Sequence, residues 1–185
     1  MTDDEQALLK RIADGDQLAL RTLYGRHSAR VFRFILQRVG TEAVAEELVN
    51  EVFLEVWRHA GSFRGQSAVT TWLFSIARNR AISLLRKRSD APLDDEMAEA
   101  IEDDADTAEV QLAKSGKAEM MRACIARLSP AHREIVDLVY YQERSVSEAS
   151  EILGIPENTV KTRMFHARKQ LSELFRRAGI DRGWP

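Results

Sequence analysis

The 185-residue sequence contains one cysteine, Cys124, so the chain cannot form an internal disulfide bond. Its helical spacing with Met121, Ile125 and Leu128 predicts a buried core thiol. The four histidines form no metal-ligand spacing with Cys124 or with one another. No nucleophile–base arrangement, glycine-rich phosphate loop or catalytic carboxylate pair stands out either. We therefore expect no metal, no other cofactor and no enzymatic activity.

Long apolar runs are also missing. No segment approaches the roughly 18 apolar residues that a membrane-spanning helix needs. The first 16 residues lack the basic start and apolar core of a signal peptide. Hydrophobic residues make up 44% and charged residues 30%, which is ordinary for a water-soluble helical protein. We expect a cytoplasmic location and no membrane insertion.

No alternating strand pattern of useful length appears, so the predicted fold class is all-α. Gly40 and Gly61 follow two of the periodic segments, as helix-ending glycines do, and Ser129-Pro130 is a typical helix start. The predicted helices cover 2–13, 17–39, 42–60, 70–88, 107–128, 130–141 and 146–153, and a last helix includes 160–174.

The net charge of −2 hides an uneven distribution. Residues 90–113 hold ten acidic residues and no basic one, so the rest of the chain carries +8. Blocks of like charge tend to stay solvated and flexible. The chain therefore reads as two mildly basic lobes joined by an acidic connector. This connector is either a solubilising linker or an electrostatic competitor that keeps a basic lobe off non-specific nucleic acid.

The stretch "SEASEILGIPENTVKTRMFHARKQL", residues 147–171, joins two helical segments through Gly154. The second carries an apolar stripe, and its opposite face is polar and cationic. A packed stripe behind a cationic face is typical of a recognition helix in the DNA major groove, and the tight corner is typical of a helix-turn-helix. The alternative is an amphipathic helical hairpin with a solvated basic face. The stripe consists of Val160, Met164, Ala167, Leu171 and Leu174; the opposite face holds Asn158, Thr162, Phe165, His166 and Lys169, flanked by Lys161, Arg163 and Arg168.

Residues 63–89 contain six basic residues and no acidic one, interleaved with Phe63, Trp72 and Phe74. Basic charge beside aromatic rings is typical of single-stranded nucleic-acid binding, where stacking contributes about 1–3 kcal/mol per base. The alternative is that these aromatics are core residues, and we expect Trp72 to be at least half buried.

Residues 42–55 carry five glutamates and no cation. Val44, Leu48, Val52 and Val56 repeat every four residues and predict an inward stripe. The outer face is then purely acidic. It suits a basic protein partner, or it is merely solvated.

These three stretches together resemble an extracytoplasmic-function (ECF, group IV) sigma factor of bacterial RNA polymerase. The matching segments, in order, are "AEELVNEVFLEVW", "FRGQS…TWLFSIARN…LLRKR" and "LSPAHREIVDL…SEASEILGIPENTVKTRMFHARKQL". The match covers about residues 6–177, and the "TWL…IA.N" run is specific. A helix-turn-helix alone would be weak evidence, because many regulators share it.

The resemblance implies an organisation and a set of roles. Residues 1–89 would be sigma region 2, 90–113 the linker and 114–185 sigma region 4. The residues that would dock on the beta-prime clamp helices of core polymerase are Glu47, Leu48, Asn50 and Glu51. Those that would bind a flipped base of the minus-10 element are Phe63, Arg64, Gly65, Gln66, Ser67, Ala68, Val69 and Asn79. Those that would bind the minus-35 element are Asn158, Lys161, Thr162, Phe165, His166 and Lys169.

The implied partners are core RNA polymerase (the beta-prime clamp helices and the beta flap), promoter DNA and an anti-sigma factor. The sequence departs from the family pattern at Thr162 and His166, where Ser and Arg are frequent, so a family promoter sequence does not transfer unchanged. A helix-turn-helix regulator with a helical sensor domain, and a helical enzyme or scaffold, are the competing functions. The basic, aromatic stretch 63–89 argues against the first, and the lack of a convergent catalytic set against the second.

Overall fold

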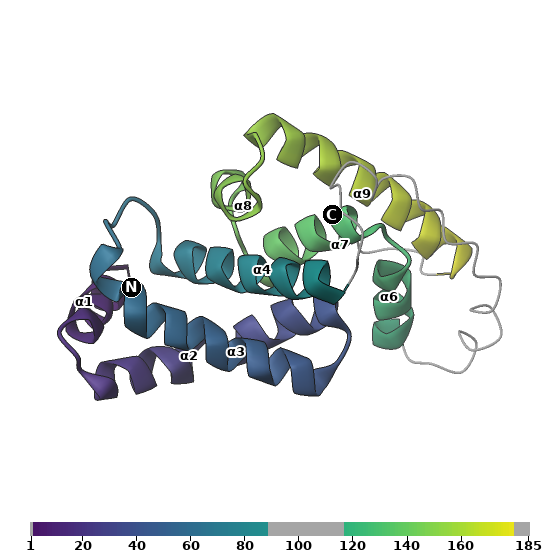
Figure 1. Ribbon diagram of the computed structural model, residues 1–185. Helices are drawn as coiled ribbons and strands as arrows, with labels where there is room; N and C mark the ends of the chain where they lie inside the picture. Colours follow the sequence, from purple (N-terminus) through teal and green to yellow (C-terminus); the bar gives the residue numbers. More distant parts are fainter. Residues whose placement is uncertain (1, 89–116, 180–185) are drawn as a thin grey trace. The chain divides into compact units, whose positions relative to one another are not determined.

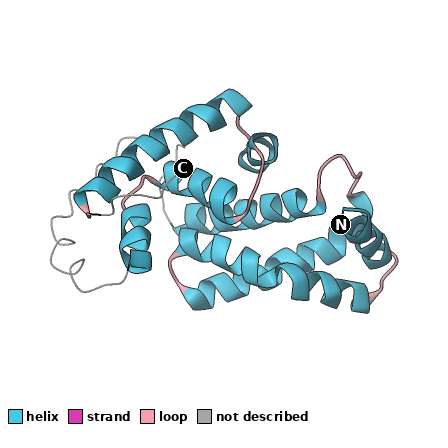
Figure 2. Cartoon of the chain, turned by 180° about the vertical axis from the view of Figure 1, so that it is seen from behind, coloured by secondary structure: helices cyan, strands magenta, loops and turns pink. Residues whose placement is uncertain are grey.

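The computed structural model describes residues 2–88 and 117–179, and the side chains within 4–88 and 119–179. Every regular element in these ranges is helical (Figure 2), as the sequence predicts. The contacts divide the chain into two compact units. One contains α1 to α4 together with α8, and the other contains α6, α7, η3 and α9 (Figure 1).

Most helices of the first unit come from the N-terminal half of the chain. They are α1 (Thr2–Ala13), α2 (Gln17–Val39), α3 (Glu42–His59), the short η1 (Ala60–Ser62) and α4 (Val69–Arg88). Asp16 caps α2 by accepting hydrogen bonds from the backbone N–H groups of Leu18 (2.9 Å) and Ala19 (3.1 Å). Gly40 ends α2 at a φ of 69°, which only glycine adopts without strain. Local chemistry therefore sets both ends of α2.

The core of this unit lies where α2, α3 and α4 meet. Phe34 of α2 packs edge-on against Phe74 of α4, with ring centroids 5.1 Å apart. Val52 and Val56, from the predicted inward stripe of α3, are fully buried. α1 packs along α2 and is fixed there by Glu5 and His27, whose carboxylate and Nε2 are 2.8 Å apart with both side chains largely buried. This rigid bundle holds the exposed faces of α3 and α4 in place.

The second unit contains α6 (Lys117–Ala126), α7 (Pro130–Val136), the π-helical turn η3 (Asp137–Tyr141) and α9 (Glu157–Arg177). Ser129 caps α7, as predicted, by accepting from the backbone N–H of His132 at 3.3 Å. Arg133 donates to the carbonyls of Ala126 and, at 3.0 Å, of Leu128, so it satisfies acceptors at the end of α6. The core includes Ile135, Leu138, Val160, Leu171 and Phe175.

Two predicted helices of this region differ from the structure. The helix predicted over 130–141 is α-helical to Val136 and then widens, because the Gln142 N–H donates to Asp137 O, five residues back, at 2.9 Å. The helix predicted over 107–128 is described from Lys117 onward, and 107–116 lie outside the described residues, as does the acidic segment 90–113.

Candidate nucleic-acid and protein interfaces

α9 presents the polar face that the sequence predicts. All six residues expected to contact the minus-35 element are exposed: Asn158, Lys161, Thr162, Phe165, His166 and Lys169. Phe165 is 65% exposed, so its ring is available for an apolar contact with a partner. Thr162 Oγ1 donates to Asn158 O at 2.9 Å, and Lys161 Nζ lies 3.8 Å from Glu157. This face can place cations and hydrogen-bonding groups against a nucleic acid.

The buried side of α9 differs from the prediction at two positions. Val160, Met164, Ala167 and Leu171 are buried as predicted, but the stripe ends on Phe175, and Leu174 is only partly buried. Arg163 was predicted to flank the cationic face, and this is wrong, because it is 9% exposed and so turned toward the packed side. The basic charge available on α9 therefore comes from the exposed cations.

Two contacts from the α7–η3 segment hold side chains of α9 in position. The His132 and His166 rings are stacked with centroids 6.4 Å apart, and His132 Nδ1 lies 3.3 Å from Gln170 Oε1. Arg168 Nε donates to the Tyr140 hydroxyl at 2.6 Å, and its guanidinium lies over the same ring. Sequence reasoning missed these contacts, because partners 28 or more residues apart leave no periodic signal.

The turn before α9 is short. α8 (Val146–Leu153) ends just before Gly154, which has a φ of 68°. The Ser150 hydroxyl donates to Ile155 O at 2.6 Å, while Ser150 O accepts from the Gly154 N–H at 2.9 Å and the Ile155 N–H at 3.2 Å. α9 then begins at Glu157. The bounds of α8 and the glycine turn are those that the sequence predicts for a helix-turn-helix, and α9 includes the predicted 160–174.

The acidic face of α3 is exposed at three of the four positions predicted to dock on polymerase. Glu47, Asn50 and Glu51 are exposed, but Leu48 is 4% exposed and belongs to the core. The Leu48 side chain is on the apolar stripe that packs into the bundle, so the accessible part of the predicted docking surface consists of the other three residues.

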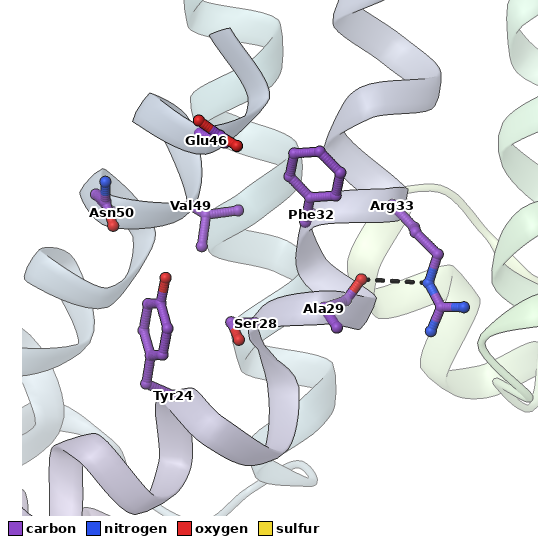
Figure 3. Close-up of a pocket in the computed structure, with 8 residues that line it drawn as sticks. All are labelled: Tyr24, Ser28, Ala29, Phe32, Arg33, Glu46, Val49 and Asn50. Atoms are coloured by element: carbon purple, nitrogen blue, oxygen red, sulfur yellow. Dashed lines mark hydrogen bonds between the residues drawn. The ribbon is translucent and has the colours of Figure 1, made fainter. Parts of the chain in front are cut away.

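A groove of 740 Å³ lies between α2 and α3, beside this acidic face (Figure 3). Tyr24 points from α2 toward Val49 of α3, and Tyr24 also contacts the Phe53 ring at 4.7 Å between centroids. The full lining is Tyr24, Ser28, Ala29, Phe32, Arg33, Glu46, Val49 and Asn50. The groove thus has both apolar and polar lining residues, and no periodicity of the sequence indicated it.

The loop that precedes α4 is largely open to solvent. Arg64, Gly65 and Gln66 are exposed, and Gly65 has a φ of 69°. Phe63, Ser67 and Ala68 are partly exposed. Val69 is 2% exposed and is the first residue of α4, so its side chain is not available to a base.

Trp72 is more than half buried, as predicted, and its ring lies 5.3 Å from that of Phe63. It lines a second pocket, of 450 Å³, together with Asn79. The lining residues are Glu55, His59, Ser62, Trp72, Ile76, Asn79, Arg80 and Ser83. None of residues 63–69 is among them, although Ser62, the chain neighbour of Phe63, is. The loop is connected to this pocket through Ser62 and through the contact of Phe63 with Trp72, and its predicted joint role with Asn79 in binding a base stays a prediction.

Cys124 is 4% exposed, which confirms the predicted core thiol, and burial raises the pKa of this thiol. Over the described ranges, the side chains of His, Cys, Asp and Glu form no group of three or more that could hold a metal ion. Among the helices described, none has the length and apolar character that crossing a bilayer requires.

Comparison with known proteins accounts for both units. Residues 23–91 match the family model for sigma-70 region 2, and residues 118–171 match that for sigma-70 region 4. The chain is 28% identical over 174 residues to the ECF RNA polymerase sigma factor SigK of Mycobacterium tuberculosis, covering 92% of this chain and 93% of SigK. It is 28% identical over 170 residues to the ECF RNA polymerase sigma factor SigM of Bacillus subtilis, covering 89% of this chain and 99% of SigM.

Among solved structures, the fold is similar to that of the sigma factor RpoE in complex with the anti-sigma factor NepR from Bartonella quintana. The TM-score is 0.65 at 24% identity, covering 88% of this chain and 98% of RpoE. The region 2 match also decides against a regulator with an unrelated sensor domain, because it covers most of the α1–α4 bundle. The two family matches and the full-length relatives agree in order and extent, and the chain therefore belongs to the sigma-70 family, as a sigma factor of the ECF type.

Proposed function

We propose that this ECF sigma factor is a group IV factor that binds core RNA polymerase and directs initiation at promoters by reading their minus-35 and minus-10 elements. It is a dissociable subunit and not an enzyme, since the polymerase performs the chemistry. It acts in the cytoplasm, where the polymerase acts. The observation that carries this function is the pairing of a solvent-exposed cationic face on α9 with a separate acidic, grooved surface on α2 and α3.

The α9 face reads the minus-35 element in the major groove. Six exposed residues at helical spacing support this role, since a recognition helix needs cations for phosphates and polar or apolar groups for base edges. Lys161, near the helix start, contacts a phosphate. Thr162, Phe165 and His166 contact base edges. The stacking of His166 on His132 restricts its ring before DNA arrives, which lowers the entropy cost of binding.

The loop 63–68 and the pocket around Trp72 and Asn79 bind the melted strand at the minus-10 element. The pocket volume of 450 Å³ suits one unstacked base beside an aromatic ring. The side-chain amide of Asn79 is exposed at its wall and can form hydrogen bonds with a base edge. The exposed side chains of Arg64 and Gln66 in this loop contact the backbone of the melted strand and its neighbouring bases.

The surface of Glu47, Asn50 and Glu51 docks on the beta-prime clamp helices of core polymerase, and the C-terminal unit engages the beta flap. Exposed carboxylates on one helix face suit a basic partner. The groove between α2 and α3 adjoins this face and provides an apolar anchor site in Tyr24, Phe32 and Val49.

An anti-sigma factor holds this chain inactive until a signal releases it. The relative RpoE, which shares the fold, is in complex with the anti-sigma factor NepR. We assign region 2 to residues 1–89, the acidic linker to 90–113 and region 4 to 114–185. The family matches over 23–91 and 118–171 support these limits, and the second match includes α8 with α9.

The test is to mix the full chain with core RNA polymerase, follow co-elution by size-exclusion chromatography, and transcribe a library of promoter fragments with the product. We expect a stable complex and transcription from a subset of fragments that share two elements. A chain that binds duplex DNA but never co-elutes with polymerase would instead be a separate DNA-binding regulator.

A further inference from the structure

A charged cluster connects the second half of α3 to the pocket on α4. Glu55 Oε1 is ion-paired with the Arg80 guanidinium, and Glu55 Oε2 lies 3.0 Å from His59 Nε2. Arg80 also lies 3.7 Å from Glu51 Oε2. Glu51 and Glu55 are one helical turn apart on α3, so the guanidinium is held between two carboxylates of the same helix.

This cluster lies at the place where a melted strand would bind. Glu55, His59 and Arg80 line the same 450 Å³ pocket as Trp72 and Asn79, and Arg80 is the chain neighbour of Asn79. A guanidinium at this position would bind backbone phosphates whatever the bases are, since phosphate contacts add affinity and no sequence information. Its pairing therefore affects how tightly the pocket binds a strand of any sequence.

We infer that Glu55 is a positioning residue that restrains Arg80 against α3 and so keeps its charge away from the strand backbone. The inference rests on the proposed binding of the melted strand by this unit. The Arg80 side chain is 36% exposed and that of Glu55 20%, so Arg80 is near enough to solvent to reach outward once the pairing with Glu55 is lost. The remaining partner, the Glu51 carboxylate, is 3.7 Å away and 52% exposed, so it holds the guanidinium less closely. With Arg80 restrained, recognition at the pocket depends on Trp72 and Asn79, which contact the base.

The experiment is a salt titration of strand binding. The full chain is titrated into a fluorescent single-stranded oligonucleotide carrying the minus-10 sequence, and into a scrambled one, from 0.05 to 0.5 M salt (about one decade), followed by anisotropy. Glu55→Gln should steepen the slope of log K against log salt by about 0.7, the value for one added phosphate contact on a single strand. The gain should be equal for both sequences, so the absolute affinity for the scrambled strand rises.

Three further variants separate this restraint from a general charge effect. Glu42→Gln removes the same charge from an exposed position in the first turn of α3 and should keep the wild-type slope. Arg80→Gln alone should also keep it, because the restrained cation makes no phosphate contact. Glu55→Gln combined with Arg80→Gln should return the slope to the wild-type value. Thermal unfolding by circular dichroism confirms that each variant is folded.

The outcomes are decisive in each direction. An unchanged slope for Glu55→Gln, or a steep slope that persists in the double variant, overturns the inference. So does a slope for Arg80→Gln that is shallower than wild type by about 0.7, because Arg80 would then already contact a phosphate. If neither wild type nor any variant binds either strand, the proposed strand-binding function fails, and the inference fails with it.

Discussion

Replacing His166 by alanine tests whether the exposed face of α9 reads bases. The His166 ring is exposed; its contacts are the stacked ring of His132 and, at 5.5 Å between centroids, the ring of Phe165. Surface substitutions of this kind usually change the free energy of unfolding by no more than about 0.5 kcal/mol. The loss of one base contact, by contrast, costs about 1–3 kcal/mol of binding, or about 5- to 150-fold in Kd. Folding and recognition are thus separable at this position.

Lys161 provides the matched comparison on the same helix. Its ion pair with Glu157 is exposed and contributes little to stability, so Lys161→Ala should also fold normally. Because it is expected to contact a phosphate, its loss should weaken binding to all duplexes alike and reduce the salt slope by about one unit. His166→Ala should instead change the preference at one or two base positions.

The assay is an anisotropy titration of single-base variants of a minus-35 duplex against wild type and both variants, at two salt concentrations. A uniform loss of affinity for His166→Ala across every duplex would refute its role as a base reader. It would also mean that α9 lies in the groove in a different orientation from the one proposed.

Three further predictions concern the N-terminal unit. Leu48→Ala should lower the free energy of unfolding by about 2–5 kcal/mol, because Leu48 is buried, whereas Leu54→Ala at a 51% exposed position should cost little; urea unfolding of both checks this. The double change Glu47→Lys and Glu51→Lys should weaken co-elution with core polymerase while circular dichroism stays unchanged; an unfolded variant, or one that binds like wild type, contradicts the docking role. Asn79→Ala should reduce open-complex formation, measured by permanganate footprinting, and leave affinity for an isolated minus-35 duplex unaltered. Equal losses in both Asn79 assays would indicate a structural role.

The sequence predicts the helices well where the boundary chemistry is local. The bounds of α1, α2 and α8 agree with the predicted ranges, because capping side chains, glycines of positive φ and a change of periodicity act within a few residues. The exposed face of α9 follows for the same reason, since 3.6 residues per turn determines which side chains lie opposite a buried stripe. At Asp137–Tyr141 the periodicity could not predict the switch to π-helical hydrogen bonding.

Prediction of individual site residues was less complete, and the misses share one cause. Leu48 and Val69 have the residue types or neighbours of a binding surface, yet both are buried in the first unit, and Arg163 of α9 is buried as well. A motif places a residue on an element, but whether its side chain faces solvent depends on what packs against that element. The roles of the exposed residues stay predictions until the experiments above are done.

By itself, the sequence determined the all-α class, most helix limits, the cationic face of α9 and the family, because each depends on residues close together in the chain or on an ordered set of motifs. The tertiary structure alone decided which predicted residues are accessible, and it brought together partners that no spacing connects. Asn79 shares a pocket with His59, and Arg80 is paired with Glu55, 25 positions earlier in the sequence. Such pairs arise from the packing of α3 against α4, and packing depends on the shapes of two helix surfaces at once, which no single stretch of sequence contains.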